Sequence, residues 1–366
     1  MRLAKVQQKL QKAVELEFAT IPPYLTAWFS IPRGTNPEAS SIIRSVFMEE
    51  MLHMVLAANL LNSIGGKVQL NQHTIPQYPL LLDFEGKVFR DRDFVVNLEK
   101  LSPASLCTFM KIELPAGWHW QKNAPKICLK CDKEKENSEE TFDVSGYTIG
   151  SFYQEIENDL EVLVKEAHGD ESKVFIGSEK EQIDINYYWG GGGKPVKVTD
   201  LASAKEAISV IVEQGEGSDH GHSVLDGDHE FFKQREEVAH FYRFREILAK
   251  RYYKPNDNPD KPPTGKKFKV SYKKVSPIKT NCTSIDFLYT PALDRLNKAF
   301  NQKYTLMLKQ MEEGLNGNPP QLYSAIMNGM HALAPIAYEM AEIPIYNNPD
   351  GETGAPSFEW DETGLH

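Results

Sequence analysis

Apolar side chains recur at helical spacing through the first 63 residues of the chain. Between Arg2 and Ser30, the side chains of Leu10, Val14 and Ile21 fall on one face of a helix. The same spacing returns from Pro37 to Ser63, where the proline suits a first helical turn and a pair of glycines follows the last one. Two long helices joined by so short a loop are typical of an antiparallel hairpin.

The pattern changes after this hairpin. Residues 66–145 are rich in proline and carry only short apolar runs, which predicts extended segments and loops, with one short helix capped by Ser102. The polar stretch 126–143 is expected to be an exposed loop, and four consecutive glycines at 190–193 predict another. Helical periodicity marks five further segments, 147–167, 200–217, 229–253, 284–314 and 319–342.

These elements predict a mainly α protein built on a four-helix bundle, with a long irregular crossover insertion and extra C-terminal helices. We place the bundle in residues 1–250 and the insertion at 66–200. A loop rich in lysine and proline occupies 251–283, and residues 284–366 are expected to supply helices and a tail that pack on the bundle. All parts are expected to form a single elaborated domain.

Two glutamate–histidine pairs lie on the apolar faces of predicted helices. Glu50 and His53 are three residues apart in the second helix, and Glu237 and His240 repeat this spacing within 229–253. At this spacing, a carboxylate and an imidazole project the same way, one turn apart. Glu17 lies on the apolar face of the first helix. One Glu-x-x-His from each of two helices, with a Glu from each of the other two, is the ligand pattern of a dimetal carboxylate bundle.

The glutamate of the remaining bundle helix is left open by the sequence. The segment 200–217 offers Glu213, which sits more securely inside the helix, and Glu216, which fits its apolar face better. A Glu-x-x-Glu pair would supply both ligands. The rival is the segment 147–167, in which Glu157 lies nearest the core face.

The donors predict the chemistry of such a site. Two divalent ions a few Å apart need several anionic ligands to offset about four positive charges, while imidazoles add neutral ligands. We expect two iron ions per chain, with a Mn/Fe pair or a single ion as alternatives because their ligand sets overlap. Tyr24 and Tyr242 are candidate catalytic residues that would hydrogen-bond to the metal ligands, although packing in an aromatic core explains both tyrosines equally well.

Net charge and cysteine content limit the classes of partner and the cellular compartment that we expect. The 366-residue chain has a formal net charge of -10, which argues against nucleic acid and anionic membranes. No run approaches the roughly 18 apolar residues of a membrane span, and the charged N-terminal segment lacks the apolar core of a secretory signal. Four cysteines in so long a chain do not indicate a disulfide scaffold, so we expect free thiols in a cytoplasmic protein. A zinc site around Cys128 and Cys131 is a less favoured alternative.

Several long motifs resemble a known family. The stretches "LEFATIPPYL", "EEMLHMVLAANLLNSIGG", "YTIGSFYQEI", "IVEQGEG", "AHFYRFREI" and "GAPSFE" are similar to the ferritin-like domain of iminophenyl-pyruvate dimer synthases, from about Leu10 to Phe358. The resemblance implies a ferritin-like fold and a stand-alone member of a family associated with bisindole pigment pathways such as that of violacein. The chain departs from the family at Ser151, where relatives usually carry a glutamate; Glu155, one turn on, is a possible substitute.

The favoured function is therefore a metal-dependent oxidase or oxygenase that activates O2 or peroxide. Its substrate would be a small amino-acid-derived or aromatic intermediate of natural-product biosynthesis, and the protein is a candidate homodimer. Two alternatives are a non-enzymatic protein that binds or handles iron and a metal-free scaffold for other pathway enzymes. A storage role fits poorly, because a long insertion and extra helices hinder assembly into a closed shell.

Overall fold

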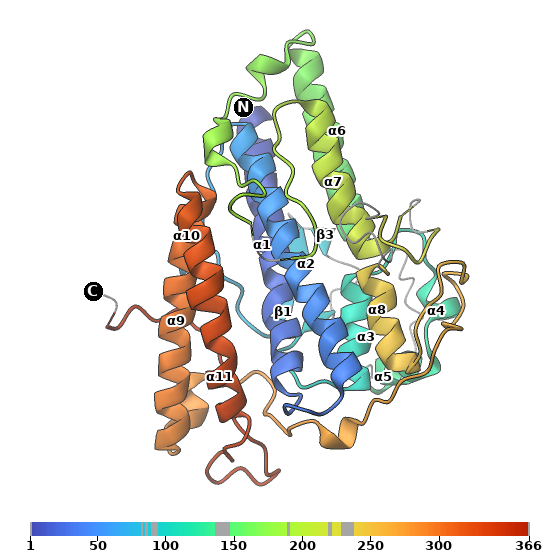
Figure 1. Cartoon of the computed structure of the whole chain (residues 1–366), viewed down its shortest axis with the longest axis vertical. Helices are drawn as coiled ribbons and strands as arrows, with labels where there is room; N and C mark the ends of the chain where they lie inside the picture. The colour runs from blue at the N-terminus through green and yellow to red at the C-terminus, as the bar shows by residue number, and fades with distance from the viewer. Residues whose placement is uncertain are drawn as a thin grey trace.

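The computed structural model describes residues 2–81, 83–84, 87–88, 94–135, 147–188, 191–218, 222–227 and 238–364, without the side chains of 83–84, 87–88 and 133–135. Within these ranges the protein is mainly helical, and two long helices form its centre (Figure 1). They are α1 (Arg2–Phe29) and α2 (Pro37–Ser63), which pack along their length as the predicted antiparallel hairpin.

Four shorter helices complete the bundle around this hairpin. They are α3 (Pro103–Ile112), α6 (Ile149–Glu166), α7 (Leu201–Glu216) and α8 (His240–Ala249). In Figure 1, α6 and α7 close the upper half of the bundle against α1 and α2, whereas α3 and α8 close the lower half. The third and fourth positions of the bundle are thus columns of two helices each, α3 with α6 and α7 with α8, and both columns are interrupted near mid-height.

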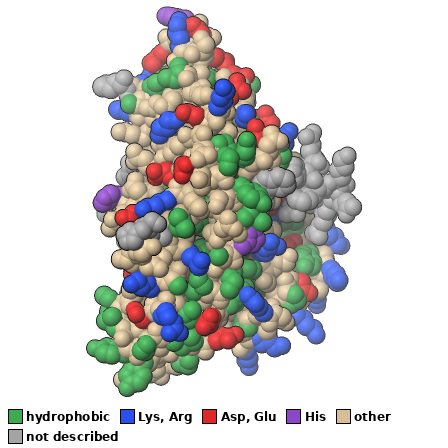
Figure 2. All heavy atoms as spheres, turned by 60° about the vertical axis from the view of Figure 1, so that its left-hand side comes forward, with side chains coloured by type: hydrophobic (Ala, Val, Ile, Leu, Met, Phe, Trp, Pro, Cys, Tyr) green, Lys and Arg blue, Asp and Glu red, His purple; other side chains and the backbone are tan. Residues whose placement is uncertain are grey.

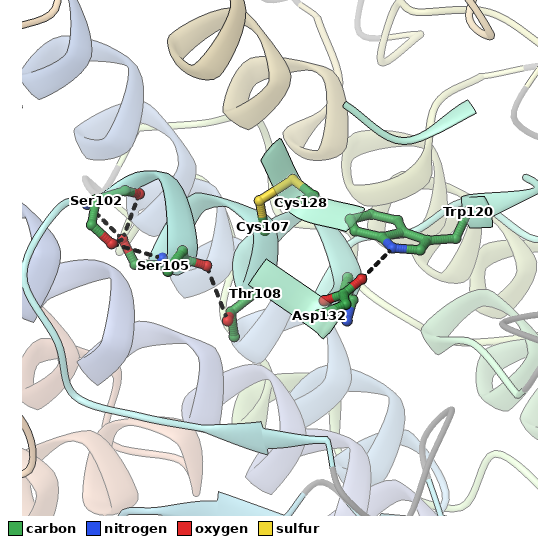
Figure 3. The surroundings of a disulfide bond; sticks show 9 residues. Ser102, Ser105, Cys107, Thr108, Trp120, Cys128 and Asp132 are labelled. Atoms are coloured by element: carbon green, nitrogen blue, oxygen red, sulfur yellow. Dashed lines mark hydrogen bonds and ion pairs between the residues drawn. A yellow bond between two sulfur atoms is a disulfide. The ribbon is translucent and has the colours of Figure 1, made fainter. Parts of the chain in front are cut away.

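The described part of the segment between α3 and α6 is more helical than its sequence suggests. It contains α4 (Trp120–Asn123) and α5 (Lys126–Lys135), so the prediction of an exposed loop from residue 126 onward is wrong in its first part. Cys128 faces inward from α5 and forms a disulfide with Cys107 of α3 (Figure 3). The expectation of free thiols is therefore wrong for these two cysteines, and a zinc site that uses Cys128 is excluded.

Two small strand pairs precede α3. Strand β1 (Leu80–Leu81) pairs antiparallel with β4 (Val95–Val96), and β2 (Asp83–Phe84) pairs with β3 (Lys87–Val88). Ser102 caps α3 as predicted, since its side chain accepts a hydrogen bond from the backbone N–H of Ser105.

The C-terminal helices cover the opposite side of the hairpin. They are α9 (Pro291–Leu315), α10 (Pro319–Ser324) and α11 (His331–Met340), with a short π-helix at Ala325–Met330 between the last two. Phe300 and Tyr304 of α9 are buried in the same core as the bundle. Figure 2 shows this side of the molecule, where apolar side chains lie among charged ones. Within the described residues, no helix combines the length and apolar character needed to cross a bilayer.

Candidate metal centre

Five buried side chains meet where the two columns are interrupted. Glu17 comes from α1, Glu50 and His53 from α2, Glu113 from the end of α3, and His240 from the first residue of α8. Each of the five is at most 3% exposed. We call these five residues the cluster. They come from all four positions of the bundle, and Glu113 and His240 each lie at the interruption of their own column, so the bundle brings them together only when it is fully assembled.

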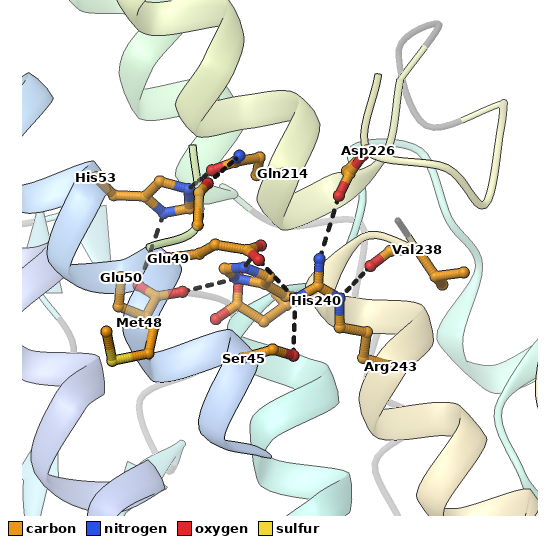
Figure 4. Close-up of polar contacts among 12 residues, drawn as sticks. Ser45, Met48, Glu49, Glu50, His53, Gln214, Asp226, Val238, His240 and Arg243 are labelled. Carbon is orange, nitrogen blue, oxygen red and sulfur yellow. Dashed lines mark hydrogen bonds and ion pairs between the residues drawn. The ribbon is translucent and has the colours of Figure 1, made fainter. Parts of the chain in front are cut away.

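Glu50 lies between the two imidazoles of the cluster (Figure 4). Its Oε1 is 2.7 Å from Nδ1 of His240, and its Oε2 is 3.8 Å from Nδ1 of His53. A second carboxylate faces each histidine, since Glu17 Oε2 is 3.7 Å from His53 Nδ1 and Glu113 Oε2 is 3.7 Å from His240 Nδ1. The two rings stack with centroids 5.2 Å apart. Ligand atoms of Glu50, His53 and His240 all lie within 4.8 Å of one another.

Hydrogen bonds on the outer side of each imidazole fix its orientation. His53 Nε2 lies 3.0 Å from Oε1 of Gln214, and the amide of Gln214 is itself oriented because its Nε2 donates to the carbonyl of Gly192 at 2.8 Å. Gln214 Oε1 can only accept, so His53 must carry its proton on Nε2. His240 Nε2 is held in the same way, 2.9 Å from Oε2 of Glu49. In its neutral form, each imidazole would therefore present the lone pair of Nδ1 to the carboxylates.

Arg243 secures this outer arrangement from α8. Its guanidinium donates to Glu49 Oε1 at 2.8 Å, to Ser45 Oγ at 3.0 Å and to Asp226 Oδ2 at 3.1 Å (Figure 4). Burial would raise the pKa of Glu49, but the nearby Arg243 and His240 lower it below its usual value. Glu49 is thus an ionised acceptor that orients His240, which is the outer-partner arrangement found around metal-bound histidines.

The inner side of the cluster requires a cation. A lone pair aimed at a carboxylate is repelled unless a proton or a metal ion lies between them. Glu50 Oε1 and His240 Nδ1 approach to 2.7 Å, yet both buried atoms lack a hydrogen-bond partner of acceptable geometry within the described chain. Burial lowers the pKa of His53, but Glu17 and Glu50 outweigh burial and raise it to about 10. The donors fit a bound metal in place of these protons.

The cluster carboxylates differ in proton affinity. Burial, reinforced by the neighbouring charge of Glu50, raises the pKa of Glu113, and burial likewise raises that of Glu17. Burial would also raise the pKa of Glu50, but His240 and His53 hold it well below the usual range. Glu50 is accordingly the carboxylate that stays ionised between the two histidines.

Two tyrosines donate hydrogen bonds to cluster carboxylates. The hydroxyl of Tyr24 donates to Oε1 of Glu113, and that of Tyr153 donates to Oε1 of Glu17 at 2.6 Å. Burial raises the pKa of both tyrosines, so they act as neutral donors. The structure thus places Tyr24, a candidate from the sequence, beside the cluster.

The structure gives Tyr242 a different environment from the one predicted. Its ring packs edge-on against Phe241 and against Tyr253, with centroids 4.9 and 5.4 Å away. This is the aromatic-core arrangement that the sequence offered as the competing interpretation. Tyr153 of α6, instead, is the second tyrosine that contacts a cluster carboxylate.

The two glutamates proposed from the segment 200–217 do not join the cluster. Glu213 is partly exposed and accepts a hydrogen bond from Ser209 Oγ, one turn earlier on α7. Glu216 is buried, and its oxygens accept the backbone N–H groups of Ala116 and Gly150 at 2.9 and 2.7 Å. The physical reason is that Gln214 and Gly215 are the residues of the last turn of α7 that face His53 and Glu113, so the side chains of Glu213 and Glu216 bond elsewhere.

Glu113 takes the position that the sequence assigned to those glutamates, and sequence reasoning missed it. The signal was present, because Leu106, Phe109 and Met110 are buried at helical spacing and Glu113 continues the same face. The helix is short and lies within the predicted crossover insertion, so nothing local marks it as part of the bundle.

Glu237 lies outside the described residues. Within the described part of the helix predicted over 229–253, the chain is helical only from His240 to Ala249, which is α8. Val238 instead forms a bridge with Leu225, and Ala239 has an extended backbone. His240 therefore reaches the cluster from a helix start rather than from the middle of a long helix.

The rival ligands on α6 point elsewhere. The backbone N–H of Ser151 bonds to the cap residue Thr148. Glu155 lies 3.6 Å from the ammonium of Lys9, and Glu157 lies 3.2 Å from that of Lys205. These contacts place both glutamates in ion pairs between helices, and neither has a described contact with the cluster.

A surface pocket of about 270 Å³ lies beside the outer partners of His240. Ser45 and Arg243 line it and also bond to each other, and Arg243 continues to Glu49. The remaining lining residues are Glu38, Ser41, Ile42, Val238, Glu246 and Tyr252. The pocket thus reaches to within two hydrogen bonds of the cluster.

The comparison with known proteins agrees with this architecture. A model of the ferritin-like family matches residues 10–249. The chain belongs to the ferritin-like family. Over 402 aligned residues it is 24% identical to dichlorochromopyrrolate synthase from Lentzea aerocolonigenes, a distant homologue in the iminophenyl-pyruvate dimer synthase family. That alignment covers 96% of this chain but only 35% of the relative, so the chain spans about a third of the relative's length.

A solved structure shares the fold. The crystal structure of a ferritin-like protein from Caulobacter vibrioides superimposes with a TM-score of 0.58 at 20% identity, over 97% of this chain and 98% of that one. The predicted fold class, a mainly helical ferritin-like fold with extra C-terminal helices, is confirmed.

Proposed function

We propose that the chain holds two iron ions among Glu17, Glu50, His53, Glu113 and His240 and uses them to oxidise a small aromatic or amino-acid-derived molecule with O2 or peroxide. One observation carries the proposal: each buried imidazole is fixed from outside so that its Nδ1 faces carboxylate oxygens. Three carboxylates and two imidazoles suit a pair of divalent ions in number, charge and donor type.

The relationship to dichlorochromopyrrolate synthase supports a biosynthetic enzyme, because that name describes the synthesis of a small organic molecule. Because the identity is low and the relative is much longer, the relationship does not identify the substrate, and the substrate class is part of what we propose. The resemblance to iminophenyl-pyruvate dimer synthases favours substrates derived from aromatic amino acids.

The residues of the cluster divide the work. Glu17 and His53 would hold an ion at one end, Glu113 and His240 would hold one at the other, and Glu50 faces both histidines. Bound iron would supply the capacity to bind and reduce O2. Because all five side chains are buried, the chain excludes bulk water from the place where oxidation occurs.

The tyrosines hold protons beside the cluster. The hydroxyl oxygen of Tyr153 lies 2.6 Å from Glu17 Oε1 and directs its proton at that oxygen, and the hydroxyl of Tyr24 does the same for Glu113 Oε1. Each hydroxyl orients one carboxylate and provides a nearby proton. The pocket beside Arg243 gives small molecules an approach on the side of His240.

Metal content is the test of this proposal. The protein would be purified from iron-supplemented cells beside Glu50→Gln and the matched control Glu213→Gln, which changes a glutamate that bonds only locally to Ser209 in the described hydrogen-bond pattern. About two irons per chain are expected in the wild type and the control, and fewer in Glu50→Gln. Oxygen consumption would then be measured with aromatic amino-acid derivatives.

Two results would overturn the proposal. A wild-type protein that stays metal-free after anaerobic addition of Fe²⁺ would remove the basis for oxidative chemistry and favour a scaffold. Bound iron in a large cage-like assembly, with no oxygen consumption coupled to any organic substrate, would favour iron handling.

A further inference from the structure

We infer that Glu216 is a positioning residue that closes the break in the third column and so holds Glu113 in place for the metal nearest His240. This inference rests on the proposed function and deepens it. It concerns a residue that the sequence offered as a metal ligand and that the structure places at a junction of three helices.

The carboxylate of Glu216 spans the interruption between α3 and α6. One oxygen accepts the N–H of Gly150, in the first turn of α6, at 2.7 Å, and the other accepts the N–H of Ala116, in the chain that leaves α3, at 2.9 Å. An unbroken helix would satisfy such backbone groups internally. Here a buried side chain from the fourth column satisfies them, and its negative charge is favourable at the N-terminus of α6.

The junction leaves no spare room. A Cβ added at Gly150 would lie 2.8 Å from Oε2 of Glu216, so only glycine lets the carboxylate approach that amide. The residue before Glu216 is Gly215, and a Cβ there would lie 3.2 Å from Oε2 of Glu113. The last turn of α7 therefore packs against the carboxylate of Glu113, while Glu216 holds the backbone of Ala116, three residues after Glu113.

Glu113 is the member of the cluster that most needs such support. It caps the end of α3 rather than lying inside a helix, and the chain turns away immediately after it. Its carboxylate faces His240 Nδ1 at 3.7 Å on one side and the Tyr24 hydroxyl on the other. If Ala116 is released, the backbone at Glu113 is fixed from one direction only. The ion between Glu113 and His240 would then bind more weakly, while the Glu17–His53 end is unaffected.

A double-mutant cycle separates positioning from a general loss of structure. Anaerobic Co²⁺ titrations, followed by absorbance and equilibrium dialysis, would compare wild type, Glu216→Gln, Glu113→Gln and the double variant, with Glu213→Gln as the control on the same helix. We expect Glu216→Gln to weaken one of two ions by about 10- to 100-fold, the range seen when outer partners of metal ligands are removed. In the Glu113→Gln background the second substitution should have no further effect. Equal losses in both backgrounds would overturn the inference.

Hydrogen exchange gives a readout that does not depend on metal. Glu216→Gln should speed exchange at the amides of Ala116 and Gly150, and unchanged protection at both would also overturn the inference. If Glu216→Gln does not fold, Gly150→Ala displaces the same carboxylate with its charge intact and should give the same weakening. A wild-type protein that binds no Co²⁺ would refute the proposed function, and the exchange data alone would then decide whether Glu216 closes the break.

Discussion

Gln214 offers the sharpest test of how the cluster is organised. Its side chain touches no cluster carboxylate in the described hydrogen-bond pattern, yet it determines which nitrogen of His53 faces inward. In Gln214→Met, a side chain of similar length replaces the amide, so His53 Nε2 loses its acceptor. The imidazole is then free to carry its proton on Nδ1, where a metal would have to displace it.

The size of the effect follows from the contacts that are lost. Outer partners of metal-bound histidines are worth about 10- to 100-fold in metal affinity, or about 1.4–2.7 kcal/mol. The same substitution also removes two buried hydrogen bonds, to His53 and to Gly192, each worth about 1 kcal/mol to folding. Gln214→Met should therefore weaken metal binding and destabilise the fold by about 2 kcal/mol.

Gln182 is a matched control for the loss of folding stability that follows when two buried hydrogen bonds are removed. It is as buried as Gln214, at 3% against 2% exposed, and its amide makes two hydrogen bonds to the backbone of Val198. Gln182→Met should lose about the same folding stability, measured by urea denaturation, and keep wild-type affinity for Co²⁺ in an anaerobic titration. Equal metal affinity in the two variants would refute the argument that Gln214 sets the tautomer of His53.

Four further outcomes are expected. Arg243→Met removes a buried cation that pairs with Glu49 and Asp226 and should lower the free energy of unfolding by about 3–5 kcal/mol in urea; a loss below about 1 kcal/mol would contradict this. Cys107→Ser opens a disulfide between residues 21 apart and should cost about 3 kcal/mol, whereas Cys131→Ser should cost little. In chelator-treated protein the pKa of His53 is raised to about 10, above its unfolded value near 6.5. Protonated His53 therefore contributes its full stabilisation of the fold below about pH 6.5, and this contribution is lost as the pH rises towards 10. The melting temperature should fall across that window. A melting temperature that does not change with pH would argue against a protonated His53 paired with the carboxylates. In Co²⁺ titrations, His240→Ala should remove the weaker of two ions, because the Glu113–His240 end is held by helix ends, and His53→Ala should remove the tighter one. The reverse order would contradict the assignment of the weaker ion to the Glu113–His240 end.

The sequence is most informative where an element is complete in itself. The hairpin of α1 and α2 was predictable with its ends, because each helix carries its own apolar face and its own stop signals. Glu17, Glu50 and His53 lie inside those uninterrupted helices, and all three reach the cluster.

The sequence is least informative where two segments far apart in the chain share one column. Nothing local shows that α3 continues as α6, or that α7 continues as α8, because the evidence for each column is the packing of both halves on the hairpin. The long helix predicted over 229–253 rested on apolar periodicity alone, whereas Val238 pairs with Leu225 and the helix begins at His240. Glu113 was missed for the same reason, since α3 is recognisable as a bundle helix only once it is seen as the lower half of the third column.

The interruptions explain why the cluster has two unlike ends. Glu17, Glu50 and His53 project from helix interiors, where backbone hydrogen bonds on both sides fix each residue. Glu113 closes the end of α3 and His240 opens α8, so each is held by helix on one side only. Positive partial charge at the start of α8 favours anionic ligands around it. Helix ends are less rigid than helix interiors, but they allow a carboxylate from one column and an imidazole from another to approach each other. The Glu113–His240 end is therefore the part of the site whose geometry depends on distant contacts, among them the hydrogen bonds of Glu49 and Glu216.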